Sequence, residues 1–311
     1  MINGKLRDSL GQFFAWASSG LAISVCLGII VYLFVKGHAQ LSLDFLLTEP
    51  TASLQDGTSG GISTPLIGTL LLAVLGMALA FPWALATAVY LAEYAGKNMA
   101  VGLLRLGIDV LAGVPTIVIA IFGVAIFTIP QLGFLSSMVE GVEGTNRAFG
   151  RSFLVAAITM AVMILPFVIK VCEEAIKAVP HSYREGSLAL GATKWHTVSH
   201  IVLPSARGGI ITGVILGMGR IIGDTAIVWL TLGGTMRMTG IQPWWQPVNW
   251  ISTLQNTGST LTSYIYYTSP AGEGNMPEKA FGASFVLIIL IVVLNLLTDF
   301  FGNYKNKVKE D

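Results

Sequence analysis

Residues 183–204 read YREGSLALGATKWHTVSHIVLP and lie between two long apolar runs. Glu185 stands near the start of this polar stretch, Gly191 follows six positions later, and Leu203 and Pro204 close it. A charged segment between two membrane spans lies outside the hydrocarbon, where a partner in the cytoplasm can bind it. The order of these residues therefore predicts a docking segment in a membrane protein.

The glycine in this stretch predicts its shape. Residues 187–190 can continue a short helix, and Gly191 supplies the positive φ that lets the chain reverse. A second helix can then run from Lys194 to Ile201, so that a short helix lies across the membrane surface and docks in a groove of a partner. A lone glycine is also common in ordinary polar loops. The order of the glutamate, the glycine and the Leu-Pro pair between two spans favours docking.

Composition places the whole chain in a membrane. Of the 311 residues, 53% are hydrophobic and 11% are charged, and the mean hydropathy is +0.72. These values exclude an ordinary soluble domain and indicate an integral membrane protein. The net charge of +1 says little about partners. Because Cys26 lies in an apolar run and Cys172 lies at the edge of the polar segment, both are expected to be free thiols.

Six apolar runs are long enough to cross a bilayer, and the sequence therefore predicts an all-α membrane protein with six transmembrane helices. The runs cover about residues 16–35, 65–90, 107–129, 152–171, 210–232 and 280–301. The first run is long for a signal peptide and is expected to be retained. Pro82, Pro115 and Pro166 lie inside three of the runs, where they either bend helices for transport or form static kinks that fit the packing.

The distribution of Lys and Arg predicts the orientation. Twelve of these residues fall on the side that holds residues 183–204, five fall on the other side, and Arg220 lies inside a span. The richer side is expected to be cytoplasmic, which places both termini inside the cell. The long stretch at residues 233–278 then faces outward, where its Trp and Tyr side chains rest at the membrane interface or touch an external partner.

The sequence lacks the motifs of an enzyme. It has no G-x-x-x-x-G-K-[ST] loop for ATP, and no serine or cysteine stands in a nucleophile motif. His196 and His200 are spaced as neighbours on one helix face, but they have no evident third ligand, which favours a solvated face over a metal site. We therefore expect no catalytic residue, cofactor or metal in this chain.

The fifth apolar run carries the most informative residues. Gly209, Gly213 and Gly217 form overlapping G-x-x-x-G repeats, which let a neighbouring helix approach closely. At about 100° per residue, Arg220 shares the face of these glycines, and Asp224 can pair with it one turn later. Charges near mid-span cost several kcal/mol unless they are paired or hydrated. They either lock two helices together or mark a substrate pathway, which is the default for intramembrane charges.

Two further charges are weaker candidates. Asp109 lies about three residues into the third run, and Lys170 lies at the end of the fourth. Each is close enough to the cytoplasmic end to snorkel or to cap a helix, so we assign neither of them a functional role.

Several segments carry a family resemblance. They are GTLLLAV (68–74), YLAEYA (90–95), LAGVPTIV (111–118), CEEAIKAVPHSYREGSLALGATKW (172–195), IVLPSARGGIITGVILG (201–217) and GRIIGDTA (219–226). From Gly61 to Phe301 the chain resembles the PstA-type permease subunits of bacterial phosphate ABC importers, and residues 183–204 are similar to the cytoplasmic EAA coupling loop of importer permeases. The GVPTIV and GRIIGDTA segments point to phosphate.

The resemblance implies a type I ABC importer permease fold. Residues 1–62 would form an N-terminal tail, the first span and an external loop; residues 63–303 would form the transmembrane domain, with the coupling loop at about 172–205; and residues 304–311 would form a cytoplasmic tail. The residues implied in coupling to the ATPase are Glu185, Gly191, Ala192, Leu203 and Pro204. Arg220 and Asp224 would line the substrate pathway.

Two departures from the family pattern stand out. The coupling loop reads Glu-Gly-Ser instead of Glu-Ala-Ala, which loosens its first helix by up to about 1 kcal/mol. Asp224 stands where the family usually has a glutamate, one methylene longer. This shorter side chain affects the geometry of the expected pair with Arg220.

The implied function is the movement of inorganic phosphate across the bacterial cytoplasmic membrane by alternating access. The implied partners are a homologous second permease, a cytoplasmic ATPase dimer that binds ATP and Mg²⁺, an external phosphate-binding protein and membrane lipid, with no nucleic acid. The sister permease of the same system and an importer permease for another oxyanion remain alternatives. A membrane scaffold without transport would explain the spans but not Arg220 at mid-membrane.

Overall fold

The computed structural model describes residues 4–50, 60–96, 98–136, 138–140, 146–148, 150–234, 238–241, 243–244 and 246–303. The predicted tail at 304–311 and most of the predicted external loop, 51–59, lie outside these residues. Nearly all of the regular structure is helical, as predicted. The exception is an antiparallel pair of three-residue strands, β1 (Met138–Glu140) and β2 (Asn146–Ala148).

Five helices in the described residues are long and apolar enough to cross a membrane. They are α1 (Gly4–Gly37), α3 (Ser63–Val89) with its π-helical extension η2 (Tyr90–Tyr94), α6 (Phe153–Lys177), α9 (Leu203–Gly223) with the turns before it, and α12 (Pro277–Asn303). A bent pair of helices, α4 (Met99–Gly113) and α5 (Thr116–Phe127), would make a sixth span.

The predicted third span at 107–129 is therefore not one continuous helix. The axes of α4 and α5 differ by 100°, and Val114 between them is extended, with φ −70° and ψ 128°. Pro115 explains the break, because it has no N–H for the helix ladder and disfavours the helical conformation of the residue before it. Pro82 and Pro166, in contrast, remain inside α3 and α6.

The core lies where α3, α6 and α9 pack together. Leu72, Met160 and Ile164 are fully buried in it. A Cβ placed on Gly76 of α3 would lie 3.2 Å from Ile221 of α9 and 3.4 Å from Cβ of Met160. Close packing of this kind fixes α3 between the other two helices.

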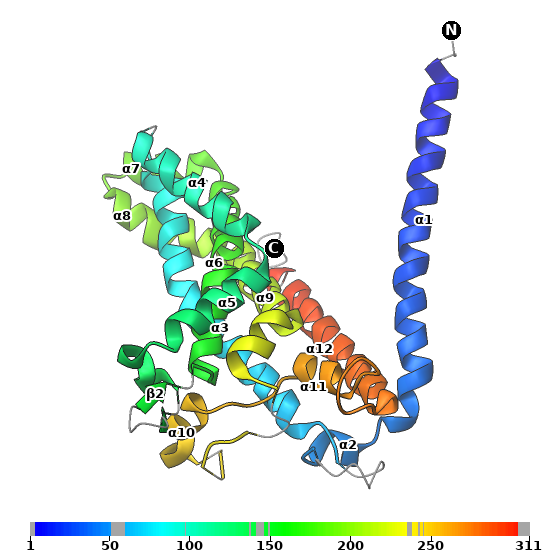
Figure 1. The fold of residues 1–311 in the computed structure, drawn as a ribbon. Coiled ribbons are helices and arrows are strands. Elements are labelled where there is room, and N and C mark those ends of the chain that lie inside the picture. Colours follow the sequence, from blue (N-terminus) through cyan, green and yellow to red (C-terminus); the bar gives the residue numbers. More distant parts are fainter. Residues whose placement is uncertain are drawn as a thin grey trace.

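Helix α1 stands apart from this core (Figure 1), and no residue in its most apolar stretch is buried. Only its C-terminal part packs on α12, where the rings of Tyr32 and Phe281 lie 5.7 Å apart and those of Phe34 and Phe285 lie 5.2 Å apart. A long helix that is apolar on all sides fits a surrounding of lipid or of another membrane subunit.

The predicted loop at 233–278 contains helices of its own. They are η6 (Pro247–Asn249), α10 (Trp250–Gln255) and α11 (Leu261–Thr268). Leu261 and Tyr264 of α11 are buried against α3 and α12, and the N–H of Leu261 donates to Oγ1 of Thr69, 2.8 Å away. The prediction of a long loop was wrong for this part, since α11 is helical and belongs to the packed body.

The elements divide between two ends of the molecule (Figure 1). The start of α1 and the helices α7 (His181–Ala189) and α8 (Lys194–Thr197) lie at the upper end of the view. The short helix α2 (Leu43–Leu47), β2 and α10 lie at the opposite end. The beginning of α1 and the predicted coupling loop therefore share one end. The remaining short 3₁₀ turns are η1 (His38–Gln40) and η3 (Pro130–Leu135).

Candidate functional site

The polar stretch between α6 and α9 folds into a hairpin of two short helices, α7 and α8 (residues 181–197), which we call the α7–α8 hairpin. Gly191 has φ +82°, the positive value that the sequence predicts for a chain reversal. The hydroxyl of Thr193 caps α8 by accepting from the N–H of His196 at 3.3 Å. The two arms are tied by a buried hydrogen bond of 2.8 Å between the hydroxyls of Ser187 and Thr197.

The second arm of the hairpin continues into α9 instead of ending at the Leu-Pro pair. Helix α8 passes through a π-helical turn, η4 (Val198–Val202), and Pro204 stands in the first turn of α9. A proline ring clashes with the carbonyl four residues earlier in an α-helix, and a π turn is a common way to absorb such a misfit. Leu203 and Pro204 thus mark a change of helical register within one long span.

The hairpin exposes an apolar surface with a carboxylate beside it. Leu190 at the turn is 89% exposed and Trp195 is 64% exposed, and Tyr183 and Leu188 are also open. The Glu185 side chain is exposed and Ala192 is partly exposed. Exposed apolar side chains gathered beside a carboxylate make the hairpin a candidate docking surface.

Arg184 fastens the hairpin to the ends of two long helices. Its guanidinium donates twice to Oε1 of Glu93 in η2, at 2.9 Å from Nε and 2.7 Å from Nη2. It also donates to the carbonyls of Val179 and Ile176, at 2.6 and 2.9 Å. The side chains of Arg184 and Glu93 are only 14% and 8% exposed. Such a shielded pair with several hydrogen bonds holds its geometry better than an exposed ion pair.

The other arm of the hairpin touches the same turn of the chain. Nζ of Lys194 lies 4.8 Å from the centre of the Tyr94 ring. A cavity of about 310 Å³ lies beside these contacts and is lined by Glu93, Arg184, Glu185 and Lys194 among others. Sequence reasoning missed Glu93, although a carboxylate directly after an apolar span, within YLAEYA, was an available signal.

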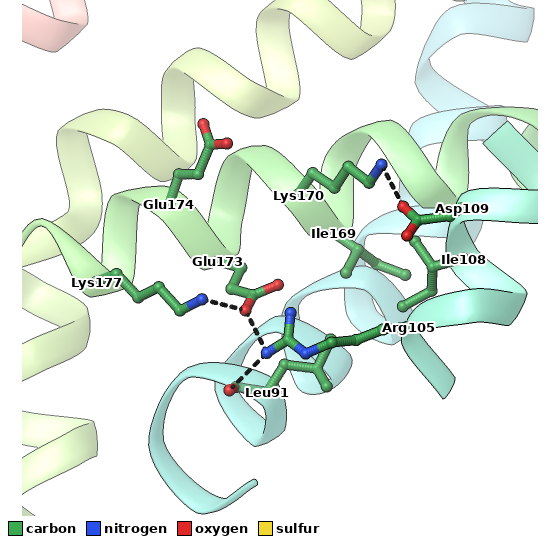
Figure 2. Close-up of a pocket in the computed structure, with 9 residues that line it drawn as sticks. All are labelled: Leu91, Arg105, Ile108, Asp109, Ile169, Lys170, Glu173, Glu174 and Lys177. Carbon is green, nitrogen blue, oxygen red and sulfur yellow. Dashed lines mark hydrogen bonds and ion pairs between the residues drawn. The ribbon is translucent and has the colours of Figure 1, made fainter. Parts of the chain in front are cut away.

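A second group of charges joins α4 to α6 (Figure 2). Nη2 of Arg105 and Nζ of Lys177 lie 2.8 and 2.6 Å from Oε1 of Glu173. Nζ of Lys170 lies 2.6 Å from Oδ1 of Asp109, so these two residues pair with each other instead of acting singly. The groups line a cavity of about 230 Å³. Since the Lys170 and Asp109 side chains are 48% and 60% exposed, their pair contributes little to stability.

The three glycines singled out on α9 lie against neighbouring helices. A Cβ at Gly209 would be 2.6 Å from Cβ of Ala175, and one at Gly213 would be 2.9 Å from Cγ1 of Val171, both on α6. A Cβ at Gly217 would be 2.5 Å from Cε of Met77 on α3. All three positions therefore allow backbone approaches that a side chain would obstruct.

Arg220 and Asp224 do not form the helical pair that the sequence suggested. Helix α9 ends at Gly223, and Asp224 is extended, with φ −77° and ψ 131°. Its Oδ1 accepts from the N–H of Ile227 at 2.8 Å, so the carboxylate caps the next turn, 226–232. None of the ion pairs in the described part of the chain involves Arg220. The i, i+4 pairing was wrong because it assumed a continuous helix through residue 224.

The guanidinium of Arg220 has a different neighbour. Its central carbon lies 5.7 Å from the centre of the Phe167 ring on α6, and the residue is exposed on the surface of this protomer. The guanidinium is therefore open to a binding partner or a ligand.

The rings of His196 and His200 stack with their centres 4.2 Å apart. The described residues contain no group of His, Cys, Asp and Glu that could hold a metal ion.

Comparisons with known proteins agree on one family. Residues 84–307 match the model of the binding-protein-dependent transport system inner membrane component. The chain is 30% identical to the probable ABC transporter permease protein YqgI of Bacillus subtilis, over 97% of both chains. It is also 30% identical to the phosphate transport system permease protein PstA 1 of Mycobacterium tuberculosis, over 95% of this chain and 88% of the relative.

A relative of a second type and a solved structure extend this picture. The chain is 29% identical to the phosphate transport system permease protein PstC 2 of Mycobacterium bovis, over 90% of this chain and 86% of the relative. Its fold is similar to a chain of a bacterial alginate ABC transporter solved with an alginate-bound periplasmic protein, with a TM-score of 0.61 and 17% identity over 94% of this chain and 93% of the other. At that identity the likeness concerns the fold alone.

Proposed function

Because the chain belongs to the family of binding-protein-dependent transport system inner membrane components, we propose that it forms part of the pathway by which inorganic phosphate crosses the inner membrane. The chain is a multi-pass membrane protein and an ABC importer permease subunit. Relatives of this kind are permease subunits and not enzymes. The choice of phosphate rests on the likeness to PstA 1, since YqgI is equally similar and its name specifies no substrate.

The observation that carries the proposal is the exposed guanidinium of Arg220. It lies exposed on a membrane-spanning helix, and none of the ion pairs among the described residues includes it. A cation facing lipid at that depth would be costly, so Arg220 is expected to face water or another subunit. A planar guanidinium stays protonated and offers paired N–H donors, which match the oxygens of a phosphate that has lost most of its water.

We propose that Asp224 modulates the charge of Arg220 without forming a salt bridge with it. Asp224 follows Arg220 by four residues, and its carboxylate interacts electrostatically with the guanidinium without forming a salt bridge. A negative charge nearby lowers the cost of the guanidinium when no anion is present, and it also weakens the binding of a passing phosphate. Weak binding is required for release on the cytoplasmic side.

The proposed assembly has four kinds of component. A homologous second permease would stand beside this chain, and an external binding protein would deliver phosphate. A dimer of ATPases, which would bind the ATP and Mg²⁺, would dock on the exposed surface of the α7–α8 hairpin through Glu185, Leu190 and Trp195. Closure of the ATPases would then move the hairpin and switch the permeases between inward-open and outward-open states.

One alternative is the sister permease of a phosphate system, supported by the similar identity to PstC 2; another is an importer for a different oxyanion. Uptake of labelled phosphate by cells that lack this chain tests the substrate directly. We expect the deletion to abolish high-affinity uptake, and the restored chain to support uptake that excess sulfate or molybdate does not inhibit. Equal inhibition by sulfate or molybdate would contradict the assignment to phosphate.

A further inference from the structure

The C-terminal end of α3, extended by the turn η2, contacts both arms of the α7–α8 hairpin. Its turn η2 binds α7 through the pair of Glu93 and Arg184 and contacts α8 through Tyr94 and Lys194. Figure 1 shows α3 running from this point to the opposite end of the molecule. A displacement of either arm of the hairpin must therefore act on α3.

One guanidinium joins three helices at this point. Arg184 belongs to α7, its acceptor Glu93 ends α3, and the carbonyl of Ile176 belongs to the last turn of α6. Because Glu93 is almost fully shielded from solvent, a loss of its charge leaves the guanidinium without a counter-charge in a shielded place. Arg184 would still keep its bonds to the two carbonyls, so α7 would stay attached to α6.

The same helix α3 reaches α9 on both sides of Arg220. Met77 of α3 packs against Gly217, one turn before the arginine, and Gly76 packs against Ile221, directly after it. Sixteen residues separate Met77 from Glu93, which corresponds to about 24 Å along an α-helix. Helix α3 thus spans the distance from the hairpin to the candidate substrate pathway.

The direct route from the hairpin to Arg220 runs along α9 and contains a weak point. The π turn η4 and Pro204 lie on it, and a proline within a helix removes one hydrogen bond of the ladder. A bend at this turn would absorb part of any movement of the hairpin. Helix α3 contains comparable features, Pro82 and the π turn η2, so it offers a second route in parallel with α9 and not a stiffer one.

We propose that Glu93 is a positioning residue that links the α7–α8 hairpin to α3, so that α3 carries the movement of the hairpin to the region around Arg220. This inference rests on the proposed importer function, and it adds a route of coupling through α3 to the covalent one through α9. If the pair with Arg184 only fastened the hairpin, its loss would weaken assembly and would leave the coupling of hydrolysis to transport unchanged.

The first test uses the complete complex in vesicles, with both permeases, the ATPases and the binding protein. Glu93→Gln should leave assembly and ATP hydrolysis intact and lower the phosphate transported per ATP hydrolysed by about threefold or more. The matched control is Asp109→Asn, which removes an exposed ion pair at the same end of the molecule and should leave this ratio unchanged. An unchanged ratio in Glu93→Gln, or a loss of assembly in place of a lower ratio, overturns the inference.

The second test does not depend on the substrate. A cysteine at Gly223, where a Cβ meets nothing within 4 Å, reports on the region of Arg220 in a background with Cys26→Ser and Cys172→Ala. Its reactivity with a soluble thiol reagent should change when ATP is added, and Glu93→Gln should abolish this change while Asp109→Asn keeps it. A change that persists in Glu93→Gln contradicts the link through α3. Vesicles that take up no phosphate but keep the ATP-dependent change would refute the substrate and leave the link standing.

Discussion

The guanidinium of Arg220 lies 5.7 Å from the centre of the Phe167 ring, and none of the ion pairs in the part of the chain that the structure describes includes this arginine. A ring face attracts a cation but does not neutralise its charge. The arginine therefore keeps its hydrogen-bond donors free for an anion. We therefore expect substitutions at residue 220 to change phosphate uptake according to the hydrogen-bond donors that they keep.

Arg220→Gln should lower phosphate uptake by about tenfold or more, because hydrogen bonds to a charged group contribute more to binding than hydrogen bonds between neutral groups. Arg220→Lys should restore little, since lysine keeps the charge but not the paired donors. Uptake of labelled phosphate and co-purification of the other subunits measure the two effects separately. Normal uptake in Arg220→Gln, or a defect in assembly alone, would mean that the residue is structural.

Asp224→Asn should impair uptake less than Arg220→Gln does. Asparagine caps the N–H of Ile227 about as well as aspartate, whereas Asp224→Ala removes the cap and costs about 1 kcal/mol. In thermal unfolding of the purified complex, Asp224→Ala should therefore unfold at a lower temperature than Asp224→Asn. Phosphate uptake by Asp224→Asn should be lower than uptake by the native protein. If Asp224→Asn unfolds as early as Asp224→Ala, the capping role is wrong.

Local features of the fold could be predicted from the sequence because their causes are local. The positive φ of Gly191 follows from the need to reverse a polar chain between two helices, and the apolar runs gave five spans by their length. The break at Pro115 was partly visible, since proline was recognised but its complete interruption of the third span was not. A sequence indicates a kink more readily than its angle.

Features that depend on distant residues could not be predicted. Glu93 and Arg184 are 91 positions apart, and Asp109 and Lys170 lie on different helices. Their pairing follows from how α3, α4 and α6 pack, which no periodicity in one segment specifies. The error at Asp224 has a local cause, because a good N-cap residue after Gly223 signals that one helix ends and another begins.

Gly191→Asp should weaken the association of the ATPase with this chain. A side chain at φ +82° strains the turn by about 1 kcal/mol or more, and a charge there would obstruct the groove of the partner. Gly186→Ala is the matched control in the same hairpin, because residue 186 is helical and its Cβ meets nothing within 4 Å. Co-purification of the ATPase should be lost in the first variant and kept in the second; equal retention in both would refute docking through this turn.

The orientation predicted from Lys and Arg can be tested with single cysteines in a background without Cys26 and Cys172. Leu190 and Val248 are 89% and 88% exposed. Leu190 directly follows α7 and Val248 lies in η6, directly before α10, and α7 and α10 lie at opposite ends of the molecule (Figure 1). In intact cells an impermeant thiol reagent should label Val248→Cys and should label Leu190→Cys only after the membrane is permeabilised. The reverse pattern of labelling would place the α7–α8 hairpin and both termini outside.

Gly209→Ala should destabilise the complex, because its Cβ would lie 2.6 Å from Cβ of Ala175. Neither atom belongs to a flexible side chain, so α6 and α9 must separate, at a cost of about 1–3 kcal/mol. Gly219→Ala on the same helix meets nothing within 4 Å and should gain up to about 1 kcal/mol from helix propensity. Thermal unfolding distinguishes the two, and Gly209→Ala combined with Ala175→Gly should recover much of the loss, because the second change removes the methyl group that collides. If the double variant is no more stable than Gly209→Ala, the close approach of α6 and α9 is not what requires glycine at residue 209.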